Sequence, residues 1–276
     1  MNDLLTQLWD KGIIQLGVWE TIYMTFISAF FAYLVGLPLG VLLCVTDKEG
    51  IHPIGWLNKL LGILVNIFRS IPFVILMIAM LPAAKLIVGT SLGNKAMIVT
   101  LIIAAIPYVA RMAESSIKEV DSGVIEAAQA MGTSSFKMIC KVLIPEAKPS
   151  LIVGAVISLV TILGYSAMAG TIGGGGLGMI AITYGYQRFN NNIIWLCVLL
   201  TVIIVQVIQE LGMLPSLHFP SQAAALQAQL TPQPLPTPLP LLLQRTPQLP
   251  LMTQLPMPRL TQRLPMKLPT ATTLSE

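Results

Sequence analysis

Five long apolar stretches dominate the pattern of hydrophobic and polar positions in this chain of 276 residues. They cover residues 18–45, 57–81, 96–110, 151–169 and 193–208. A helix that crosses a hydrocarbon core about 30 Å thick needs about 20 mostly apolar residues. We therefore expect five transmembrane helices, the third and fifth completed by their flanking residues. The predicted fold class is an all-α integral membrane protein, with a transmembrane domain over residues 18–213.

The composition agrees with a protein that uses lipid as a solvent. Hydrophobic residues make up 55% of the chain and charged residues 10%, whereas soluble domains carry about 25% charged residues. The net charge of +4 is small and the basic residues form no dense patch, so nucleic acid is not an expected partner. The three cysteines and two histidines show no metal-binding spacing, and no metal site is expected.

Lysine and arginine predict the orientation in the bilayer. The segments 46–56 and 111–149 are richer in these residues than the segments on the opposite side. By the positive-inside rule both segments face the cytoplasm. The N-terminal segment 1–17 is then periplasmic or interfacial, and the C-terminus is cytoplasmic.

Proline marks both the predicted helices and the end of the chain. Pro38, Pro72 and Pro107 lie inside or near the ends of helices, and each should kink its helix locally. Most of the 20 prolines fall in residues 214–276, together with Gln, Leu and Thr. We expect a disordered or polyproline-like tail there. That this tail is a non-native extension is a hypothesis.

The cytoplasmic loop 111–149 carries signals for two short helices. Asp121 or Ser122 can cap the first helix, which should begin near Val124. Gly132 can end it in a left-handed conformation. Two interpretations stay open: an element that docks on a soluble partner, or an amphipathic surface segment that only connects two spans.

The second short helix of this loop should begin after Thr133 as its cap. Pro145 is expected to stop it, and Pro149 to begin the next span. One apolar face at helical spacing is predicted, made of Phe136, Ile139, Cys140, Leu143 and Ile144.

The same loop resembles a known signature. The run EAAQAMG at residues 126–132, followed by Ile144 and Pro145, is similar to the E-A-A…G…L-P motif of ABC importer permeases, with Ile-Pro in place of Leu-Pro. The resemblance covers about residues 17–212 and extends to the methionine importer permeases of enteric bacteria. It implies a type I importer fold with a coupling helix that docks on an ATPase subunit. The implied coupling residues are Glu126, Ala127, Ala128, Gly132, Ile144 and Pro145.

The resemblance also implies partners and a location. They are a homodimer, two ABC ATPase subunits that bind ATP and Mg, and a periplasmic methionine-binding lipoprotein, assembled in the bilayer of the bacterial inner membrane. This chain contains no Walker A motif, so it is expected to hold no cofactor and not to be an enzyme. The implied substrate is L- and D-methionine. Another small amino acid or solute, a secondary transporter and an intramembrane protease are the alternatives.

Candidates for the translocation path and its gate lie in two spans. Arg69 belongs to the run FRSIPF at residues 68–73, which resembles an R-x-x-P element of the same importers. A charge within a hydrophobic window is a functional candidate, although Arg69 could instead cap carbonyls or pair within the dimer. Ser158, Thr161 and Tyr165 share one face of the fourth span, with Ser166 beside them. They could line the path, or they could hydrogen-bond across helices.

A glycine-rich segment precedes the last span. It lacks the following Lys-Ser/Thr of a phosphate-binding loop. It resembles the periplasmic loop of amino-acid importers. It should let helices approach closely, and an outer gate or a contact for the binding protein is the further reading. Its candidate residues are Gly173, Gly174, Gly175, Gly176 and Gly178.

Overall fold

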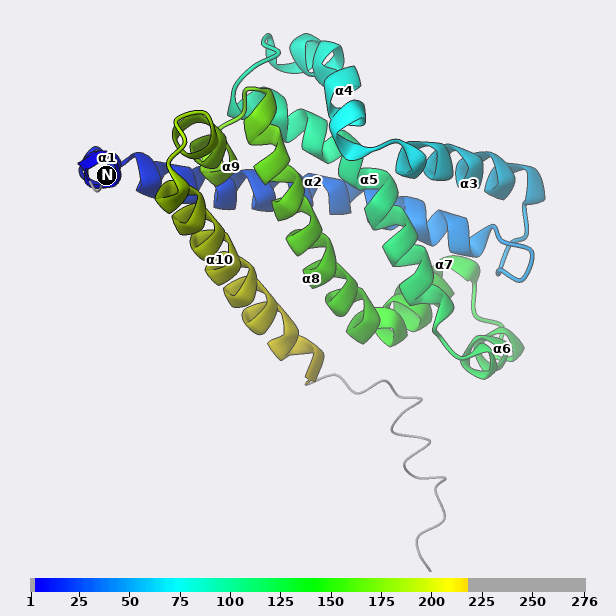
Figure 1. Cartoon of the computed structure of the whole chain (residues 1–276). Helices are drawn as coiled ribbons and strands as arrows, with labels where there is room; N and C mark the ends of the chain where they lie inside the picture. The colour runs from blue at the N-terminus through cyan, green and yellow to red at the C-terminus, as the bar shows by residue number, and fades with distance from the viewer. Residues whose placement is uncertain (1–2, 218–276) are drawn as a thin grey trace, which may run out of the picture. The chain divides into compact units, whose positions relative to one another are not determined.

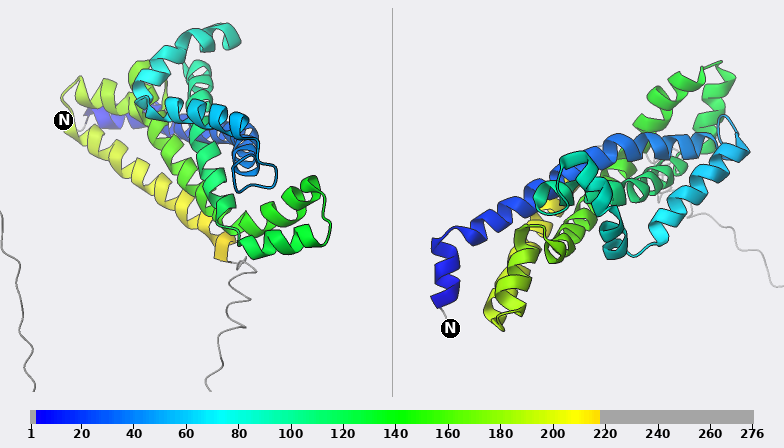
Figure 2. Two further views of the ribbon diagram at one scale, coloured as in Figure 1. Left: turned by 90° about the vertical axis from the view of Figure 1, so that its right-hand side faces the viewer. Right: turned by 90° about the horizontal axis from the view of Figure 1, so that it is seen from above.

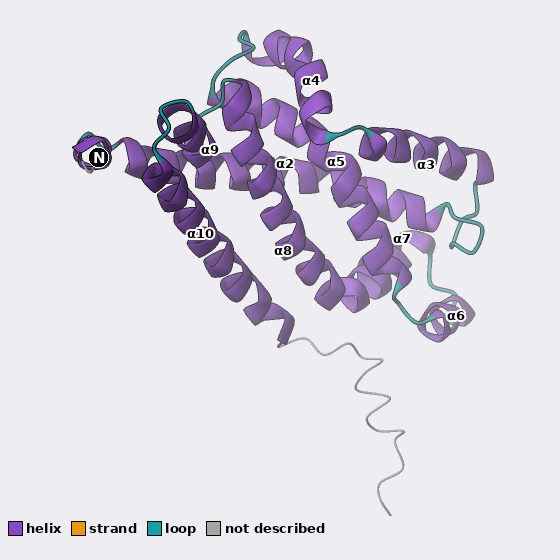
Figure 3. Cartoon of the chain, viewed as in Figure 1, coloured by secondary structure: helices purple, strands orange, loops and turns teal. Residues whose placement is uncertain are grey.

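The computed structural model describes residues 3–217, which fold into helices joined by short turns (Figures 1 and 3). The helices, in chain order, are α1 (Asp3–Asp10), α2 (Ile13–Val45), α3 (Gly55–Ser70), α4 (Phe73–Val88), α5 (Asn94–Lys118), α6 (Ser122–Ala130), α7 (Ser135–Met138), α8 (Ile144–Ala169), α9 (Gly176–Ile180) and α10 (Asn191–Leu217). π-helical turns at Ile139–Leu143 and Ala181–Tyr186 and a 3-10 turn at Gly170–Ile172 lie next to α8 and α9.

Within residues 3–217, four helical stretches are long and apolar enough to cross a membrane: α2, α5, the continuous stretch Ser135–Ile172 and the Asn191–Leu214 part of α10. The pair α3 and α4 passes the same test together, but the two helices are bent by 108° at the break between them. With the bent pair counted as one span, the chain has the five spans that the sequence predicts. The prediction of one helix over residues 57–81 is wrong.

Pro72 explains the break. A proline pushes the residue before it out of the helical region, and Ile71 is extended with φ −78° and ψ 127°. Proline also has no N–H for a bond to the preceding turn. Pro38 and Pro107, in contrast, lie inside α2 and α5 without ending them.

Both ends of the described chain differ from the predicted boundaries. The first span begins at Ile13, because α2 follows α1 directly after Gly12 in the left-handed region (φ 71°). At the other end α10 continues to Leu217, beyond the predicted domain limit at 213. The remainder of the predicted tail, residues 218–276, lies outside the described residues.

Small residues bring α2 and α5 into close contact at the centre of the bundle, and α8 packs against both. A β-carbon added at Gly40 of α2 would lie 2.5 Å from the carbonyl oxygen of Ala110 and 2.7 Å from the Cβ of Ala113. Packing of this kind holds membrane helices together, because lipid tails compete with larger apolar side chains. In both views of Figure 2 the segment α6–α7 projects from the side of the bundle that lies away from the N-terminus.

The α2–α5 contact predicts an effect of one methyl group. Gly40→Ala should lower the free energy of unfolding by about 1–3 kcal/mol, because the new methyl meets backbone that cannot move aside. Gly62→Ala is the matched control, since a β-carbon at this helical glycine of α3 meets nothing within 4 Å. Thermal denaturation in detergent measures both variants. Equal melting temperatures for the two would contradict the close packing.

Candidate functional site

The segment that carries the importer-like motif is a helix ended by a left-handed glycine. Asp121 is the N-cap of α6, and its carboxylate accepts a hydrogen bond from the Gly123 N–H at 2.7 Å. The helix therefore begins at Ser122, two residues before the predicted start. Gly132 has φ 72°, and its N–H donates to the Gln129 carbonyl at 2.9 Å. The predicted cap and glycine turn are both confirmed.

The motif residues divide between the surface and the interior. Glu126 and Ala127 are exposed, whereas Ala128 is buried. Met131, at the end of α6, is 78% exposed. The helix thus presents a carboxylate and an apolar side chain to solvent, while one alanine fixes it to the rest of the chain. An exposed large apolar side chain beside a rigid turn is the kind of feature found at protein contacts.

The helix that follows Gly132 differs from its prediction. Its N-cap is Ser134 rather than Thr133, and neither end carries a side-chain capping bond. Pro145 does not stop the helix, and Pro149 does not begin one, because the helical path runs without a break from Ser135 to Ile172. A π-helical turn precedes Pro145. Such a turn shifts the hydrogen-bond ladder, at the point where proline offers no N–H.

The π turn also changes which side chains face inward. It inserts one extra residue, so the buried positions are Met138, Leu143 and Ala147, spaced by five and then by four. Of the predicted apolar face, Leu143 is buried, and Ile139 and Ile144 are half-buried. The prediction is wrong for two members of that face, because Phe136 is 76% exposed and Cys140 is exposed.

A chain of ionic contacts ties the end of α5 to the loop before α3. Lys118 lies 2.5 Å from Asp47 and 3.0 Å from Glu114, and Arg111 lies 2.5 Å from Glu114. Arg111 also donates to the Asn66 side chain of α3 at 3.0 Å. The hydrogen bond from Lys118 lowers the pKa of the Asp47 carboxyl below its ordinary value. The spacing of the three α5 charges, i, i+3 and i+7, was a readable signal for this network.

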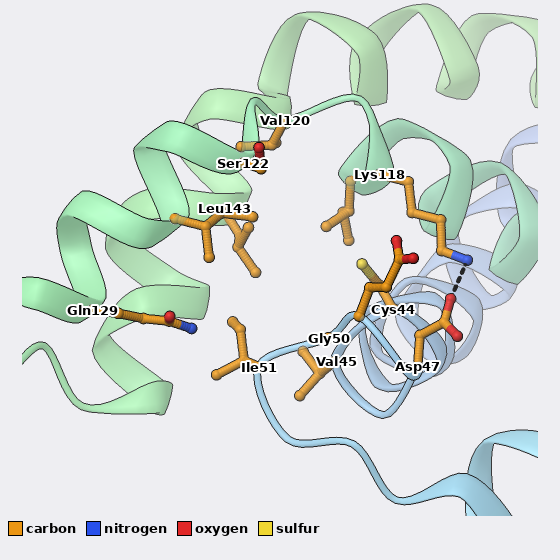
Figure 4. A pocket seen from close by; sticks show the side chains of 13 residues that line it. Cys44, Val45, Asp47, Gly50, Ile51, Lys118, Val120, Ser122, Gln129 and Leu143 are labelled. Atoms are coloured by element: carbon orange, nitrogen blue, oxygen red, sulfur yellow. Dashed lines mark hydrogen bonds and ion pairs between the residues drawn. The ribbon is translucent and has the colours of Figure 1, made fainter.

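A cavity of about 380 Å³ separates this ionic chain from α6 (Figure 4). Its walls come from the end of α2 and the following loop, from the end of α5, and from α6 and the π turn, with Asp47, Ile51, Lys118, Ile125, Gln129 and Leu143 among the lining residues. Beside this cavity the ring of His52, in the loop between α2 and α3, lies 2.5 Å from the hydroxyl of Ser135 at the start of α7. The loop between α2 and α3 thus contacts α7 directly and faces α6 across the cavity.

The glycine-rich segment is anchored by side chains of α2 and α5. Three successive backbone N–H groups donate to them, Gly175 to Asn94 at 2.7 Å, Gly176 to Glu20 at 2.8 Å and Leu177 to Thr21 at 2.9 Å. Asn94 also donates to Glu20 at 2.7 Å. Sequence reasoning missed Glu20, because its only signal was an acid near the start of an apolar run. A close approach of backbone explains the glycines. Their roles as an outer gate or a binding-protein contact stay predictions.

Glycine is required at particular positions of this segment. Gly173 and Gly176 have φ values of 102° and 87°, in the left-handed region. A β-carbon at Gly176 would lie 2.7 Å from the Thr21 hydroxyl, and one at Gly174 would lie 2.9 Å from the Ala169 carbonyl oxygen. Gly178 packs directly against the backbone of Ala167. Side chains at these positions would push the segment away from α2 and α8.

Two of the predicted pathway residues line one cavity of about 270 Å³. Arg69 reaches it from the end of α3 and Tyr165 from α8. Tyr165 stacks on Phe73 with ring centroids 4.0 Å apart and planes 6° from parallel. Thr161 lies behind the cavity wall, with its hydroxyl 3.4 Å from that of Tyr108.

The two predicted serines lie elsewhere. Ser158 is buried, donates to the Gly154 carbonyl at 2.8 Å, and accepts from the Tyr33 hydroxyl at 3.1 Å. Ser166 is buried and donates to the Leu163 carbonyl of its own helix at 2.8 Å. The contact of Ser158 with Tyr33 crosses between helices, as in the second of the two readings, whereas the bond of Ser166 stays within its own helix.

The ionic chain predicts a stability effect with a built-in control. Glu114→Gln should lower the free energy of unfolding by about 1–3 kcal/mol, since it leaves two cations without the buried carboxylate between them. Glu119→Gln removes an exposed carboxylate one residue after α5 and should change the free energy of unfolding by less than about 0.5 kcal/mol. Thermal denaturation of both variants in detergent measures the difference. A Glu114→Gln variant as stable as Glu119→Gln would show that the contacts of Glu114 with Arg111 and Lys118 contribute nothing to stability.

Comparisons with known proteins assign the chain to a family. It is 48% identical over 203 residues to the probable D-methionine transport system permease protein MetI of Vibrio cholerae, covering 74% of this chain and 90% of that relative. It is 50% identical over 154 residues to the D-methionine transport system permease protein MetI of Escherichia coli K12, covering 56% and 71%.

Solved structures agree with the sequence comparisons. The inward-facing MetNI methionine ABC transporter matches with a TM-score of 0.75 at 44% identity, over 78% of this chain and 98% of that chain. An amino acid ABC transporter crystallised with histidines, at 18% identity and a TM-score of 0.65, shares the fold. Residues 32–211 match the family described as binding-protein-dependent transport system inner membrane component. With more than half of its length matched, this chain belongs to the family of inner membrane components of binding-protein-dependent transport systems.

Proposed function

We propose that this chain is the permease subunit of an ATP-driven importer and forms the translocation path for methionine, in both its L and D forms. The observation that carries the proposal is the segment α6–Gly132–α7, which projects from the end of the spans and exposes Glu126 and Met131. A soluble partner can bind such a projecting helix. The family membership and the names of the relatives support the substrate.

The proposed assembly contains two copies of this chain, two ABC ATPase subunits and a periplasmic methionine-binding lipoprotein. ATP and Mg belong to the ATPase subunits, and this chain contributes transport without an enzymatic activity of its own. The MetNI methionine ABC transporter, with which the chain shares its fold at 44% identity, supports a partnership with an ATPase. In this arrangement α6 faces the cytoplasm, the N-terminus lies in the periplasm, and the C-terminus is cytoplasmic.

The proposed cycle is a shift between two populated conformations of the permease. Closure of the ATPase subunits moves α6 and α7, and the contact between Ser135 and His52 passes the movement to the loop between α2 and α3. The contacts of Lys118 with Asp47 and of Arg111 with Asn66 then carry it to α3. Binding protein delivers the substrate to the outward-facing state, and ATP hydrolysis returns the inward-facing one.

Coupling should depend on the backbone conformation at Gly132. Gly132→Val should reduce uptake per ATP hydrolysed by at least about fivefold, because valine strongly disfavours the left-handed conformation that aims α6. No atom lies within 4 Å of a β-carbon at this position, so steric clash is not the cause. ATPase activity and uptake are measured together in proteoliposomes.

Gly89→Val is the matched control for this variant. Gly89 is also left-handed (φ 80°) with no atom within 4 Å of an added β-carbon, but it ends α4, far along the chain from the coupling segment. It should cost similar backbone strain and leave the ratio of uptake to hydrolysis unchanged. An unchanged ratio in Gly132→Val, or an equal fall in both variants, would remove the coupling role of the glycine turn.

The function itself is tested by uptake of labelled methionine into proteoliposomes that hold this chain with its ATPase and binding protein. Uptake should require ATP, and the double variant Glu126→Ala/Gly132→Val should abolish it in an assembled dimer. ATP-dependent uptake of a different solute would retain the importer and exclude methionine. Transport of any solute without nucleotide would favour a secondary transporter.

A further inference from the structure

The cavity of about 270 Å³ at the break of the bent span contains an unpaired positive charge. It is lined by Phe68, Arg69, Ile71, Phe73, Leu76, Ala104, Tyr108 and Tyr165. None of these residues is acidic. Among residues 3–217 Arg69 has no salt bridge, whereas Arg111 has one and Lys118 has two. Arg69 is exposed in the structure, so its guanidinium is accessible to a ligand. A guanidinium in an apolar span without a counter-ion is unfavourable, so this cavity favours a ligand that brings an anion.

Half of the residues that line the cavity are aromatic. Phe73 of α4 and Tyr165 of α8 stack at 4.0 Å between ring centroids. Tyr108 of α5 adds a hydroxyl, which lies 3.4 Å from that of Thr161. The cavity therefore combines a flat aromatic surface and the hydroxyls of two tyrosines with a cation. Pockets that bind small organic molecules combine an apolar lining with a few polar groups in this way.

The helix break supports the same kind of ligand. The last carbonyls of α3 and the first N–H groups of α4 have no partners within their own helices, and Pro72 caps α4 without a side-chain hydrogen bond. Residues on both sides of the break line the cavity. The C-terminal end of α3 presents partial negative charge, and the N-terminal end of α4 presents partial positive charge. Interrupted membrane helices in transporters use such ends to hold charged substrate groups.

We propose that this cavity is a binding site for the zwitterionic backbone of an α-amino acid with an apolar side chain. Arg69 and the start of α4 hold the α-carboxylate, the end of α3 receives the α-ammonium group, and the rings of Phe73 and Tyr165 receive the side chain. A thioether is well suited to this surface, because sulfur makes favourable contacts with aromatic rings. The inference rests on the proposed function and adds the residues that would contact the substrate.

A lipid phosphate could supply the same anion, but Arg69 is poorly placed for one. It is separated from the start of α3 at Gly55 by about 21 Å of helix, at 1.5 Å per residue. A headgroup at the beginning of α3 does not extend that far. The aromatic pair and the two helix ends also match an amino acid better than a phosphodiester.

The experiment uses the photoreactive diazirine analogue of methionine on the purified permease–ATPase assembly, and peptide mass spectrometry locates the label on the permease. Label is expected on residues 68–76, Tyr108 or Tyr165. Excess methionine should block it, whereas 3-(methylthio)propylamine, which lacks the carboxylate, and phosphatidylglycerol should not. Equal blocking by the amine would overturn the role of the carboxylate, and blocking by phosphatidylglycerol alone would assign the site to lipid.

Variants test the residue itself. Arg69→Gln should reduce labelling by about tenfold or more, and Arg69→Lys should retain part of it, since charge-assisted hydrogen bonds are lost in the first and only rearranged in the second. Lys59→Gln, which removes an exposed cation of α3 outside the cavity, should leave labelling unchanged. Label elsewhere, or full label in Arg69→Gln, would overturn the inference even if ATP-driven uptake succeeds. Failure of that uptake with every solute would overturn the proposed function instead.

Discussion

In the hydrocarbon core of a bilayer an unpaired backbone N–H or C=O costs several kcal/mol, because no water can replace the missing partner. Irregular backbone is therefore tolerated only where protein groups satisfy it or where it lines a cavity. The glycine-rich segment meets the first condition, since Glu20, Thr21 and Asn94 accept three of its N–H groups. The break between α3 and α4 meets the second, since residues from both sides of it line a cavity. One constraint thus accounts for the two least regular parts of the membrane domain.

Helix α3 carries two functional candidates on one face, close to its end. Asn66 receives a hydrogen bond from Arg111, which belongs to the ionic chain beside α6. Arg69, one turn later, lines the cavity at the break. Residues three apart lie next to each other on a helix. The ionic chain that ends at Asn66 and the cavity lined by Arg69 therefore meet on α3 within a single turn. The break after Ser70 interrupts the helical hydrogen bonds between α3 and α4, so the two helices are separate elements.

The features that could be predicted from the sequence have local causes. The apolar stretches, the Asp121 cap and the left-handed Gly132 each depend on a residue type and its nearest neighbours. The failures involve longer range or a change of register. Pro72 predicted a local kink, but the bend between α3 and α4 is 108° and ends one helix before the next begins. The π turn before Pro145 leaves Phe136 exposed. Glu20 became visible only when residues 156 positions apart in the chain were brought into contact.

Charged side chains in the described spans differ in whether a partner within the chain satisfies them. Glu114 and Lys118 are paired, and Glu20 accepts two hydrogen bonds, so each of these residues stabilises the fold in which it sits. Arg69 has no such partner among the described residues, and it raises the free energy of the empty chain. A ligand that supplies the missing anion would bind most tightly to the conformation in which the guanidinium reaches it. Substrate can shift the equilibrium between the two conformations only by the difference between its affinities for them. An arginine without a partner gains a new ion pair when substrate binds, whereas an arginine that is already paired does not.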